Sequence, residues 1–585
     1  MSGIDAPSRA LRGGRVTRVA RPAVLAVLAG SLAACGGRSV QPWEYAPRPM
    51  ADTLPILEPA EQKIPLAYEA AHQFLFRPVG EPFTTEGEAV NVDPLDEVAN
   101  STWFTNRNAA EPLTPEQVRR GPQATDGPRP PLTVTHVEPE GVTPKFWVED
   151  ADGVRYIVKL DPAEHPELAS GAEVVATNLF WAAGYYTPEN YAFDFDPSEL
   201  QLEDELEAVF LDEDSLPLEY VVGADEEDEQ ELTLEVFTRE FFDGRPRTPG
   251  GRIRALASRF LDGTPKGPFN FAGTRPDDPN DVIPHEHRRE LRGLYVVEAW
   301  LNQTDTKSGN SLDMFILHPR SPEDEEAARF GHLRHNLIDF GSSLGSAAVR
   351  PHTPRHGQEN EFDLAAIGKR FITLGFWRLP WQSETDTLHP PSVGYFSSKD
   401  FEPRGWKPNM PNPAFDNITD RDGYWGAKLV MSFTDPQLFA AVEAGRYSDP
   451  RAAQIILRTL QERRDMTGRA WFSRVSPLDD PRVEGDALVF DDLWIRHFGG
   501  VAQYQWRLDW DAPDPDLEAE GESTVQRIEL PRPEGSVDVD EDHPEDALAR
   551  LRVWKVQEDG DRAPRPATFR FQWTGGGWRL AGLRY

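Results

Sequence analysis

The chain contains a single cysteine, Cys35, among its 585 residues. One thiol cannot form an intramolecular disulfide, and it cannot supply a structural zinc site that needs several thiolates. The fold must therefore be held together by apolar packing and by polar contacts. Hydrophobic residues make up 39% of the chain, with 16 Trp and 31 Phe, which is enough for packed cores. A chain of this length predicts roughly two to four domains.

The cysteine follows a segment typical of an export signal. A basic leader is followed by a short apolar run, Ala23–Leu32, which is too short to span a bilayer. The basic residues of the leader are Arg9, Arg12, Arg15, Arg18 and Arg21. The sequence Leu32-Ala33-Ala34-Cys35-Gly36 resembles a bacterial lipobox. This resemblance implies that the signal peptide 1–34 is removed and that Cys35 becomes the lipidated N-terminus, with acyl chains such as palmitate. The alternative is an ordinary secretory signal with an incidental cysteine.

The charge of the chain excludes one large class of partners. A net charge of −37 argues against nucleic acid, because binding to phosphate backbones needs clustered Lys and Arg. Removal of the leader makes the charge more negative still, so attachment to an anionic membrane must rest on the lipid. We expect a lipid-anchored protein of the bacterial cell envelope that faces the periplasm. Gly36, in place of the Asp that often signals inner-membrane retention, favours the outer membrane.

Composition and periodicity divide the mature chain into three parts. Residues 35–130 are rich in Pro and polar residues and are interpreted as a tether and N-terminal extension, with a spacer from 36 to about 63. Residues 131–475 begin with strands, a helix and a further strand, which predicts an α+β domain. These elements are expected at Leu132–Val137, Lys145–Glu149, Val154–Leu160, Glu167–Ala183 and Tyr191–Phe195. Residues 476–585 change to alternating patterns such as Tyr504–Trp510, which predict a C-terminal antiparallel β-sandwich.

Three separate segments carry residues suited to phosphoryl transfer. A nucleotide triphosphate needs an ammonium on its phosphate oxygens and a carboxylate that holds this ammonium, which Lys159 and Glu173 could supply. Asn310 and Asp339 are hard oxygen ligands of the type that Mg²⁺ prefers. Asp305 could orient or deprotonate the acceptor.

The last of these residues, Lys307, could neutralise the phosphoryl group as it moves. Together the residues predict an ATP (or other nucleotide) site with Mg or Mn.

The order Lys159, Glu173, Asp305-x-Lys307-x-x-Asn310, Asp339-Phe340-Gly341 resembles the protein-kinase signature set. The sequence around these motifs is more similar to atypical kinase-like proteins, namely the lipid-kinase-like group, the persistence-toxin kinases and secretory-pathway kinases. In those families a stretch like the one from Gly141 to Phe146 tends to replace the Gly-rich loop. The resemblance therefore implies a bilobal kinase-like domain over residues 131–475, with Gly141 and Lys145 beside the nucleotide. Gln303-Thr304 stands where the His-Arg pair of protein kinases would precede the catalytic Asp.

The leading hypothesis is a membrane-anchored lipoprotein whose kinase-like domain binds a Mg-nucleotide and transfers phosphoryl to an unknown acceptor. A second hypothesis is a catalytically inactive kinase-like scaffold of the cell envelope. A third is a serine hydrolase, since Gly341-Ser342-Ser343-Leu344-Gly345 fits the nucleophile-elbow pattern. Ser343 would then be the nucleophile. The candidate bases for it are His352, His356 and His389. His285-Glu286-His287 could hold zinc, but it lacks the spacing of a helical zinc motif, and a role at the start of the following helix is the simpler interpretation.

Overall fold

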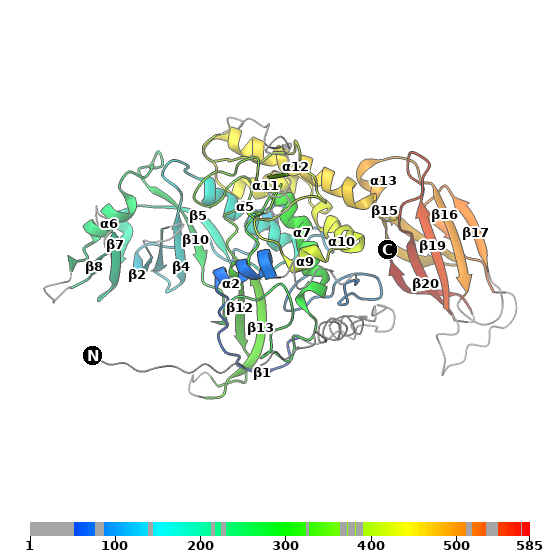
Figure 1. Cartoon of the computed structure of the whole chain (residues 1–585), viewed down its shortest axis with the longest axis horizontal. Coiled ribbons are helices and arrows are strands. Elements are labelled where there is room, and N and C mark those ends of the chain that lie inside the picture. The colour runs from blue at the N-terminus through cyan, green and yellow to red at the C-terminus, as the bar shows by residue number, and fades with distance from the viewer. Residues whose placement is uncertain are drawn as a thin grey trace, which may run out of the picture.

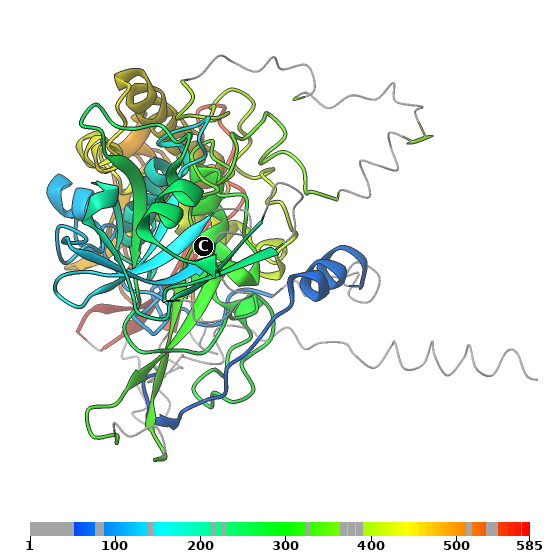
Figure 2. The ribbon, with the colours of Figure 1, turned by 90° about the vertical axis from the view of Figure 1, so that its left-hand side faces the viewer.

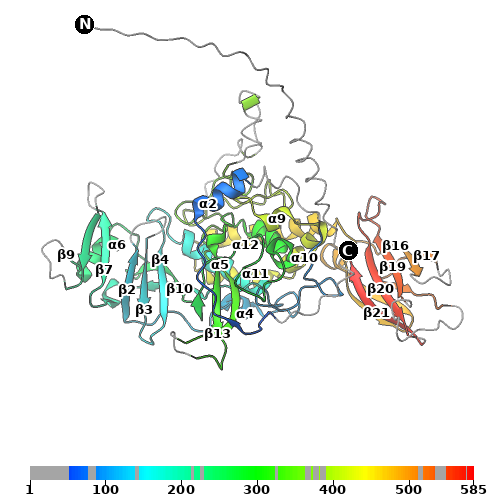
Figure 3. The ribbon, with the colours of Figure 1, turned by 60° about the horizontal axis from the view of Figure 1, so that its bottom comes forward.

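The structure is a computed structural model of the whole chain. It describes residues 52–76, 87–138, 144–211, 217–223, 230–322, 327–362, 371–372, 381, 390–510, 518–533, 548–574 and 576–585. Over these ranges the chain is a mixed α+β protein with five β-sheets, so the predicted α+β class is confirmed. A six-stranded sheet lies at one end of an elongated molecule, helices occupy the middle, and the C-terminal sheets lie at the other end (Figures 1 and 3). Among the described helices, none combines the length and the apolar character needed to cross a membrane.

The six-stranded sheet contains the first four predicted strands. Its order is β5-β10-β4-β3-β2-β6, and its neighbours are antiparallel except for β2 and β6. The strands are β2 (Leu132–Glu138), β3 (Lys145–Glu149), β4 (Arg155–Leu160), β5 (Asn190–Phe195), β6 (Leu200–Leu202) and β10 (Ile253–Arg259). Two helices, α5 (Leu168–Ala183) and α6 (Leu234–Phe242), pack against it. A short turn, η2 (Pro197–Glu199), and a small sheet of β7 (Glu207–Leu211), β8 (Pro217–Val221) and β9 (Gln230–Glu231) complete this end.

The two faces of this sheet have different chemistry. Alternate residues of a strand point to opposite faces. Val158 of β4 is buried on the face where Phe146 packs against Phe237 of α6, with ring centroids 5.3 Å apart. Lys159, the next residue, points to the face that α5 covers. The sheet therefore presents an apolar core on one side and a charged side chain on the other.

Helices form the middle of the molecule. They are α4 (Pro115–Arg120), α7 (Arg289–Leu301), α9 (Pro413–Asp416), α10 (Asp420–Met431), α11 (Asp435–Ala444) and α12 (Pro450–Phe472). The helix expected after His285-Glu286-His287 is confirmed as α7, which follows the turn η3 (His285–His287). Close packing of α7 on α10 requires a glycine, because a Cβ at Gly293 would lie 2.6 Å from the Trp425 ring.

A long hairpin extends from the helical middle. β12 (Ser311–Leu317) and β13 (Phe330–Leu337) pair in antiparallel fashion, with β11 (Thr264–Pro265) on one edge and β1 (Ile56–Leu57) on the other. Figure 2 shows the N-terminal segment, in blue, running from the tip of this hairpin towards the helical body. Part of the expected spacer is therefore docked as β1, and the ion pair between Glu58 and Lys266 (2.6 Å) also holds it.

The C-terminal part consists of two antiparallel sheets, as the alternating patterns predicted. One sheet contains β14 (Leu478–Glu484), β15 (Ala487–Asp492) and β18 (Arg527–Glu529). The other has the order β17-β16-β19-β20-β21, formed by β16 (Tyr504–Trp510), β17 (Ala519–Ser523), β19 (Leu548–Lys555), β20 (Ala567–Trp573) and β21 (Trp578–Arg584). Phe490 of β15 contacts Tyr504 of the second sheet, with ring centroids 5.1 Å apart. A short helix, α13 (Leu493–Phe498), links β15 to β16.

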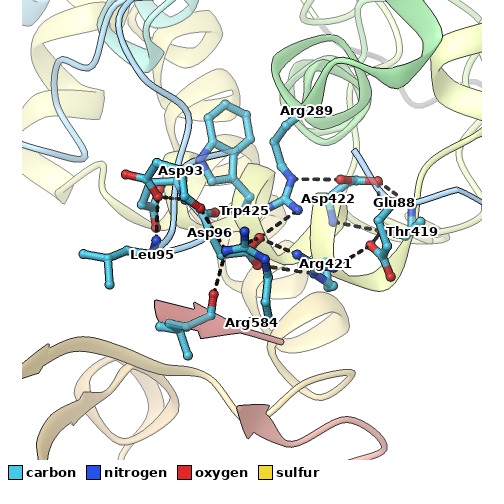
Figure 4. Close-up of polar contacts among 12 residues, drawn as sticks. Glu88, Asp93, Leu95, Asp96, Arg289, Thr419, Arg421, Asp422, Trp425 and Arg584 are labelled. Atoms are coloured by element: carbon cyan, nitrogen blue, oxygen red, sulfur yellow. Dashed lines mark hydrogen bonds and ion pairs between the residues drawn. The ribbon is translucent and has the colours of Figure 1, made fainter. Parts of the chain in front are cut away.

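A buried ion network joins the N-terminal extension, the helices and the last strand (Figure 4). The Asp96 side chain has no exposed surface, and its Oδ1 lies 3.2 Å from Arg289 of α7, 2.5 Å from Arg421 of α10 and 3.9 Å from Arg584 of β21. Asp422 adds a second carboxylate, 2.9 Å from Arg289. Burial opposes the charge of Asp96, but Arg289 and Arg421 outweigh it, so the pKa of Asp96 is lowered.

We expect Asp96→Asn to lower the free energy of unfolding by about 3–5 kcal/mol, because it removes a fully buried carboxylate that neutralises several buried guanidinium groups at once. Since the pKa of Asp96 is lowered in the folded chain, this stability should be present above the ordinary carboxyl range and lost as the pH falls through it. Urea unfolding followed by tryptophan fluorescence measures both effects. The matched control is Asp152→Asn, whose pair with Arg129 (2.7 Å) is exposed and is expected to contribute less than about 1 kcal/mol. An equal loss in both variants would contradict the prediction.

Candidate functional site

Lys159 lies near the centre of the six-stranded sheet. Its strand β4 pairs with β3 on one side and β10 on the other, so that Lys145 and Leu256 are its Cα partners. A strand with neighbours on both sides has little freedom to move, and the position of Lys159 is therefore fixed by the sheet.

The Lys159 ammonium sits between two carboxylates. Its Nζ lies 3.1 Å from Glu173 Oε1 and 3.2 Å from Asp339 Oδ1. The Glu173 side chain is 4% exposed and that of Asp339 is 48% exposed, so one carboxylate is sealed in the protein and the other faces open space. The sequence predicted the contact between Lys159 and Glu173, and the structure adds Asp339 to it.

The strand that carries Lys159 also fixes the helix that carries Glu173. Asp161 Oδ1 accepts hydrogen bonds from the backbone N–H groups of Ala169 (2.9 Å) and Ser170 (2.8 Å), in the first turn of α5. These N–H groups have no partner inside the helix, so the carboxylate caps it. Sequence analysis missed Asp161, although an acid shortly before a predicted helix was the available signal.

Pairing of β12 with β13 brings Asn310 and Asp339 to the same place. Ser311 begins β12 and pairs with Leu337 at the end of β13. The Ile338 N–H then donates to the Asn310 backbone oxygen at 3.0 Å. Asn310 and Asp339 therefore flank the same end of the hairpin. Two ligands of one Mg²⁺ ion, the role predicted for them, would need to lie close together in this way.

Asp339 is held in an uncommon backbone conformation. Its φ is 60°, in the left-handed region that residues other than Gly seldom adopt. Gln303 Nε2 donates to the Asp339 backbone oxygen at 3.1 Å, and Gln303 Oε1 accepts from the Ser343 hydroxyl at 3.0 Å. The sequence analysis noted Gln303 only because it occupies the position of the His-Arg pair of protein kinases. In the structure, its hydrogen bonds connect the loop before Asp305 to the segment around Asp339.

Asp305, Lys307 and Asn310 form a second cluster. Lys307 Nζ lies 2.7 Å from Asp305 Oδ2, and Asn310 Nδ2 donates to the same oxygen at 3.1 Å. Asn310 Nδ2 also donates to the Asp305 backbone oxygen at 2.7 Å, so the short turn η4 (Ser308–Asn310) folds back on Asp305. The Asp305 side chain is thereby fixed by two donors.

The two clusters share one cleft of about 550 Å³. Its walls include six of the predicted residues, which are Lys145, Lys159, Glu173, Asp305, Lys307 and Asp339. Asn310 contacts Asp305 but is not part of the wall. Gly141 and Cys35 lie outside the described residues. Asp161, Arg350 and Asn409 also line the cleft, and the sequence analysis did not select them.

The Lys159 cluster shifts the titration of its members in different directions. Lys159 lowers the pKa of Asp339, so this carboxylate stays charged. Burial raises the pKa of Glu173 from an ordinary value of 4.5 to about 7, although Lys159 opposes the shift. Burial also disfavours the charge on Lys159, but the two carboxylates outweigh it and raise its pKa. One ammonium between two carboxylates thus keeps Asp339 ionised, while Glu173 takes up a proton near neutral pH.

The alternative serine site does not form among the described residues. Ser343 is fully buried, and its hydroxyl donates to Gln303. The His352 ring contacts Asn302 and Thr304, each at 3.3 Å, and His356 contacts Thr353. His389 lies outside the described residues. Neither His352 nor His356 therefore has Ser343 as its hydrogen-bond partner.

The His285-Glu286-His287 segment divides its rings between separate partners. His285 Nε2 lies 2.7 Å from Asp281, whereas His287 Nδ1 accepts from Arg292 at 2.9 Å. Within the described part of the chain, no three His, Cys, Asp or Glu residues form a group that could hold a metal ion. The segment leads into α7, in agreement with the expected role at the start of that helix.

No protein-family model matches the chain, and no curated protein is significantly similar to it in sequence. The site must therefore be interpreted from its own geometry.

We expect the stability of the chain to depend on Glu173 around neutral pH. The folded chain keeps a proton on Glu173 that the unfolded chain has already released, because burial raises its pKa to about 7. Stability should then fall as the pH rises from about 5 to about 8. Glu173→Gln removes this titration, so the difference between the unfolding midpoints of variant and wild type should change steadily across that range in thermal unfolding. A difference that does not vary with pH would show that Glu173 titrates normally.

Proposed function

We propose that the protein binds a Mg-nucleotide in the cleft around Lys159 and transfers the terminal phosphoryl group to an acceptor hydroxyl. The observation that carries the proposal is the convergence of Lys159, Glu173, Asp305, Lys307 and Asp339 on one cleft, from segments that are up to about 180 residues apart. Catalysis of phosphoryl transfer consists largely of positioning and charge stabilisation, which needs this set of groups.

The arrangement of the cleft supports a kinase-like, bilobal interpretation of residues 131–475. One wall comes from the sheet and α5, which supply Lys159 and Glu173, and the other comes from the loop after α7 and the end of β13. The Lys159–Asp339 contact at 3.2 Å bridges the two walls. This is similar to the placement of a nucleotide between two lobes in the atypical kinase-like families.

Each residue has a distinct part in the proposed reaction. Lys159 binds phosphate oxygens and Glu173 keeps it in position. Asp305 takes the proton of the acceptor hydroxyl as its oxygen forms a bond to the terminal phosphorus. The bond from this phosphorus to the bridging oxygen breaks, which leaves a nucleoside diphosphate and a phosphorylated acceptor, and Lys307 neutralises charge on the group in transit.

The donor set fits a hard divalent cation such as Mg²⁺ or Mn²⁺. Asp339 offers a carboxylate that stays ionised and faces the cleft, and Asn310 is an oxygen donor at the same end of the β12–β13 hairpin. Such ions take few protein ligands when phosphate oxygens complete their coordination. The cation would supply charge neutralisation for the phosphates.

We further propose that the chain acts at the bacterial cell envelope, attached through lipidated Cys35 and facing the periplasm, with the outer membrane favoured. The lipobox-like sequence supports this, and the negative net charge of −37 leaves the lipid as the means of attachment.

A scaffold that binds nucleotide or a partner without turnover is the second candidate. The engagement of Asp305 Oδ2 by both Lys307 and Asn310 favours it, because these two contacts already occupy the oxygen that would accept the proton of an acceptor hydroxyl. The kinase and the scaffold differ in turnover and not in nucleotide binding, so the experiments below distinguish them.

Asp339→Ala should weaken Mg-nucleotide binding by at least about tenfold, since it removes the exposed carboxylate that holds the cation. Calorimetry with ATP and Mg²⁺ on the full chain measures this affinity. The matched control is Asp152→Ala, an exposed acid on the turn between β3 and β4, which should bind like wild type. Unchanged affinity in Asp339→Ala would remove Asp339 from the cation site.

Asp305→Asn should reduce turnover by about 10²–10⁴-fold, the usual contribution of a general base, and leave nucleotide affinity unchanged. Release of nucleoside diphosphate at saturating Mg-ATP measures the rate. If the wild type binds the nucleotide but forms no more product than Asp305→Asn, the scaffold function is correct.

A further inference from the structure

The loop between α7 and Asp305 is held from several sides. It begins at Asn302, which follows the last residue of α7 with a φ of 53°, a left-handed conformation that Asn tolerates better than most residues. The Thr304 N–H donates to the Ser342 backbone oxygen at 3.2 Å, and the Thr304 backbone oxygen accepts from the Asn409 N–H at 2.8 Å. The backbone next to Asp305 is thus fixed on two sides, and the remaining contacts of the loop involve side chains.

An indole N–H fixes the orientation of the Asn302 amide. Trp406 Nε1 donates to Asn302 Oδ1 at 2.9 Å, and an indole nitrogen can only donate. The amide oxygen therefore faces Trp406, and Nδ2 faces the other side. There Nδ2 lies 3.3 Å from Nδ1 of His352. Because an amide nitrogen is a donor, Nδ1 of His352 must be the acceptor.

The acceptor at Nδ1 determines where His352 carries its proton. The ring is buried, and burial lowers its pKa well below the ordinary value of 6.5, with a further contribution from the neighbouring His356. His352 is therefore neutral, and a neutral imidazole that accepts at Nδ1 carries its proton on Nε2. Nε2 then donates to the hydroxyl oxygen of Thr304, which lies 3.3 Å away.

These hydrogen bonds form one buried chain that ends at the residue before Asp305. The Trp406 indole donates to Asn302, and Asn302 donates to His352. His352 in turn donates to Thr304, and all four side chains are buried. Water does not readily replace a lost partner at a buried group, so removal of the His352 ring nitrogens would leave Asn302 and Thr304 unsatisfied.

We propose that His352 is a positioning residue that holds the Asp305 loop in place through the hydrogen bond from its Nε2–H to Thr304. Within the described part of the chain, His352 is not among the residues that line the cleft, so it acts through Thr304 and not by contact with a substrate. Its part in the reaction rests on the proposed phosphoryl transfer, in which Asp305 takes the acceptor proton. The hold on the loop does not depend on nucleotide.

Hydrogen exchange of the full chain without nucleotide, followed by mass spectrometry, tests the hold on the loop. His352→Phe keeps an aromatic ring against His356, where the two ring centroids are 4.3 Å apart, but it removes both hydrogen bonds. It should speed exchange in peptides that cover residues 302–305 by at least about tenfold, because the loop opens more often. His352→Gln, whose amide has an acceptor and a donor, should bring exchange back to within about threefold of wild type.

Thr304→Val is a second variant that removes only the acceptor of the His352 bond, and it should speed exchange in the same peptides. The matched control is Ser476→Ala, at the C-terminal sheets. The buried Ser476 hydroxyl also makes two hydrogen bonds, since it donates to the Arg565 backbone oxygen and accepts from the Lys555 N–H, each at 3.0 Å. Unchanged exchange of residues 302–305 in His352→Phe and Thr304→Val would overturn the proposal. Equal acceleration in Ser476→Ala would overturn it too, since exchange would then follow global stability.

Turnover tests the part of His352 in the reaction. At saturating Mg-ATP, His352→Phe should lower turnover by about 10²-fold, the effect of a displacement of about 1 Å, and leave nucleotide affinity in calorimetry unchanged. His352→Gln should recover most of the rate. A loss of affinity as large as the loss of turnover would overturn the positioning role, because the variant would then disturb the whole cleft. A wild type without turnover would contradict phosphoryl transfer itself, whereas the exchange experiment would still decide whether His352 holds the loop.

Discussion

The structure depends on one buried carboxylate. Asp96 has no exposed surface, and the arginines around it come from α7, α10 and β21, three elements that span almost 300 residues of sequence. A buried charge must be paired, so these elements have to meet in one arrangement. In a chain with a single cysteine, this network performs the role that disulfides have in proteins with several cysteines, and it fixes the last strand against the helices.

The same network determines where the candidate site can form. Arg289 lies in the first turn of α7, and the loop with Asp305 follows directly after the end of that helix. Anchoring α7 therefore also anchors the loop. The opposite wall of the cleft is built independently, because Asp161 holds α5 against β4. The proposed site is thus an interface between two separately supported units, joined by the ion pair of Lys159 with Asp339.

Local patterns predicted the elements, and residue chemistry predicted most of the cleft. Period-two runs predicted the strands β2 to β5, and the order of charged residues predicted the Lys159–Glu173 contact. Sequence analysis missed β10, which inserts between β4 and β5 although it begins almost 60 residues after the end of β5, and which contains three polar positions. It also missed the docking of residues 52–76, because this depends on single contacts such as Glu69 with Ser308 and not on a periodic pattern.

The charges of the cleft explain why nucleotide and cation would have to enter together. Each lysine of the cleft already has a carboxylate partner: Lys145 pairs with Glu138 (2.8 Å), Lys159 with Glu173 and Asp339, and Lys307 with Asp305. A triphosphate alone would have to separate these pairs while adding negative charge. If a divalent cation were held by Asp339, it would compensate the carboxylate and leave Lys159 available for a phosphate oxygen. Glu173 can stay in contact with Lys159 when the nucleotide is bound. Because the pKa of Glu173 is raised to about 7, this carboxyl group adds little negative charge to the cleft near neutral pH. The proposed function would therefore require Asp339 to release Lys159, with which it is paired in the structure.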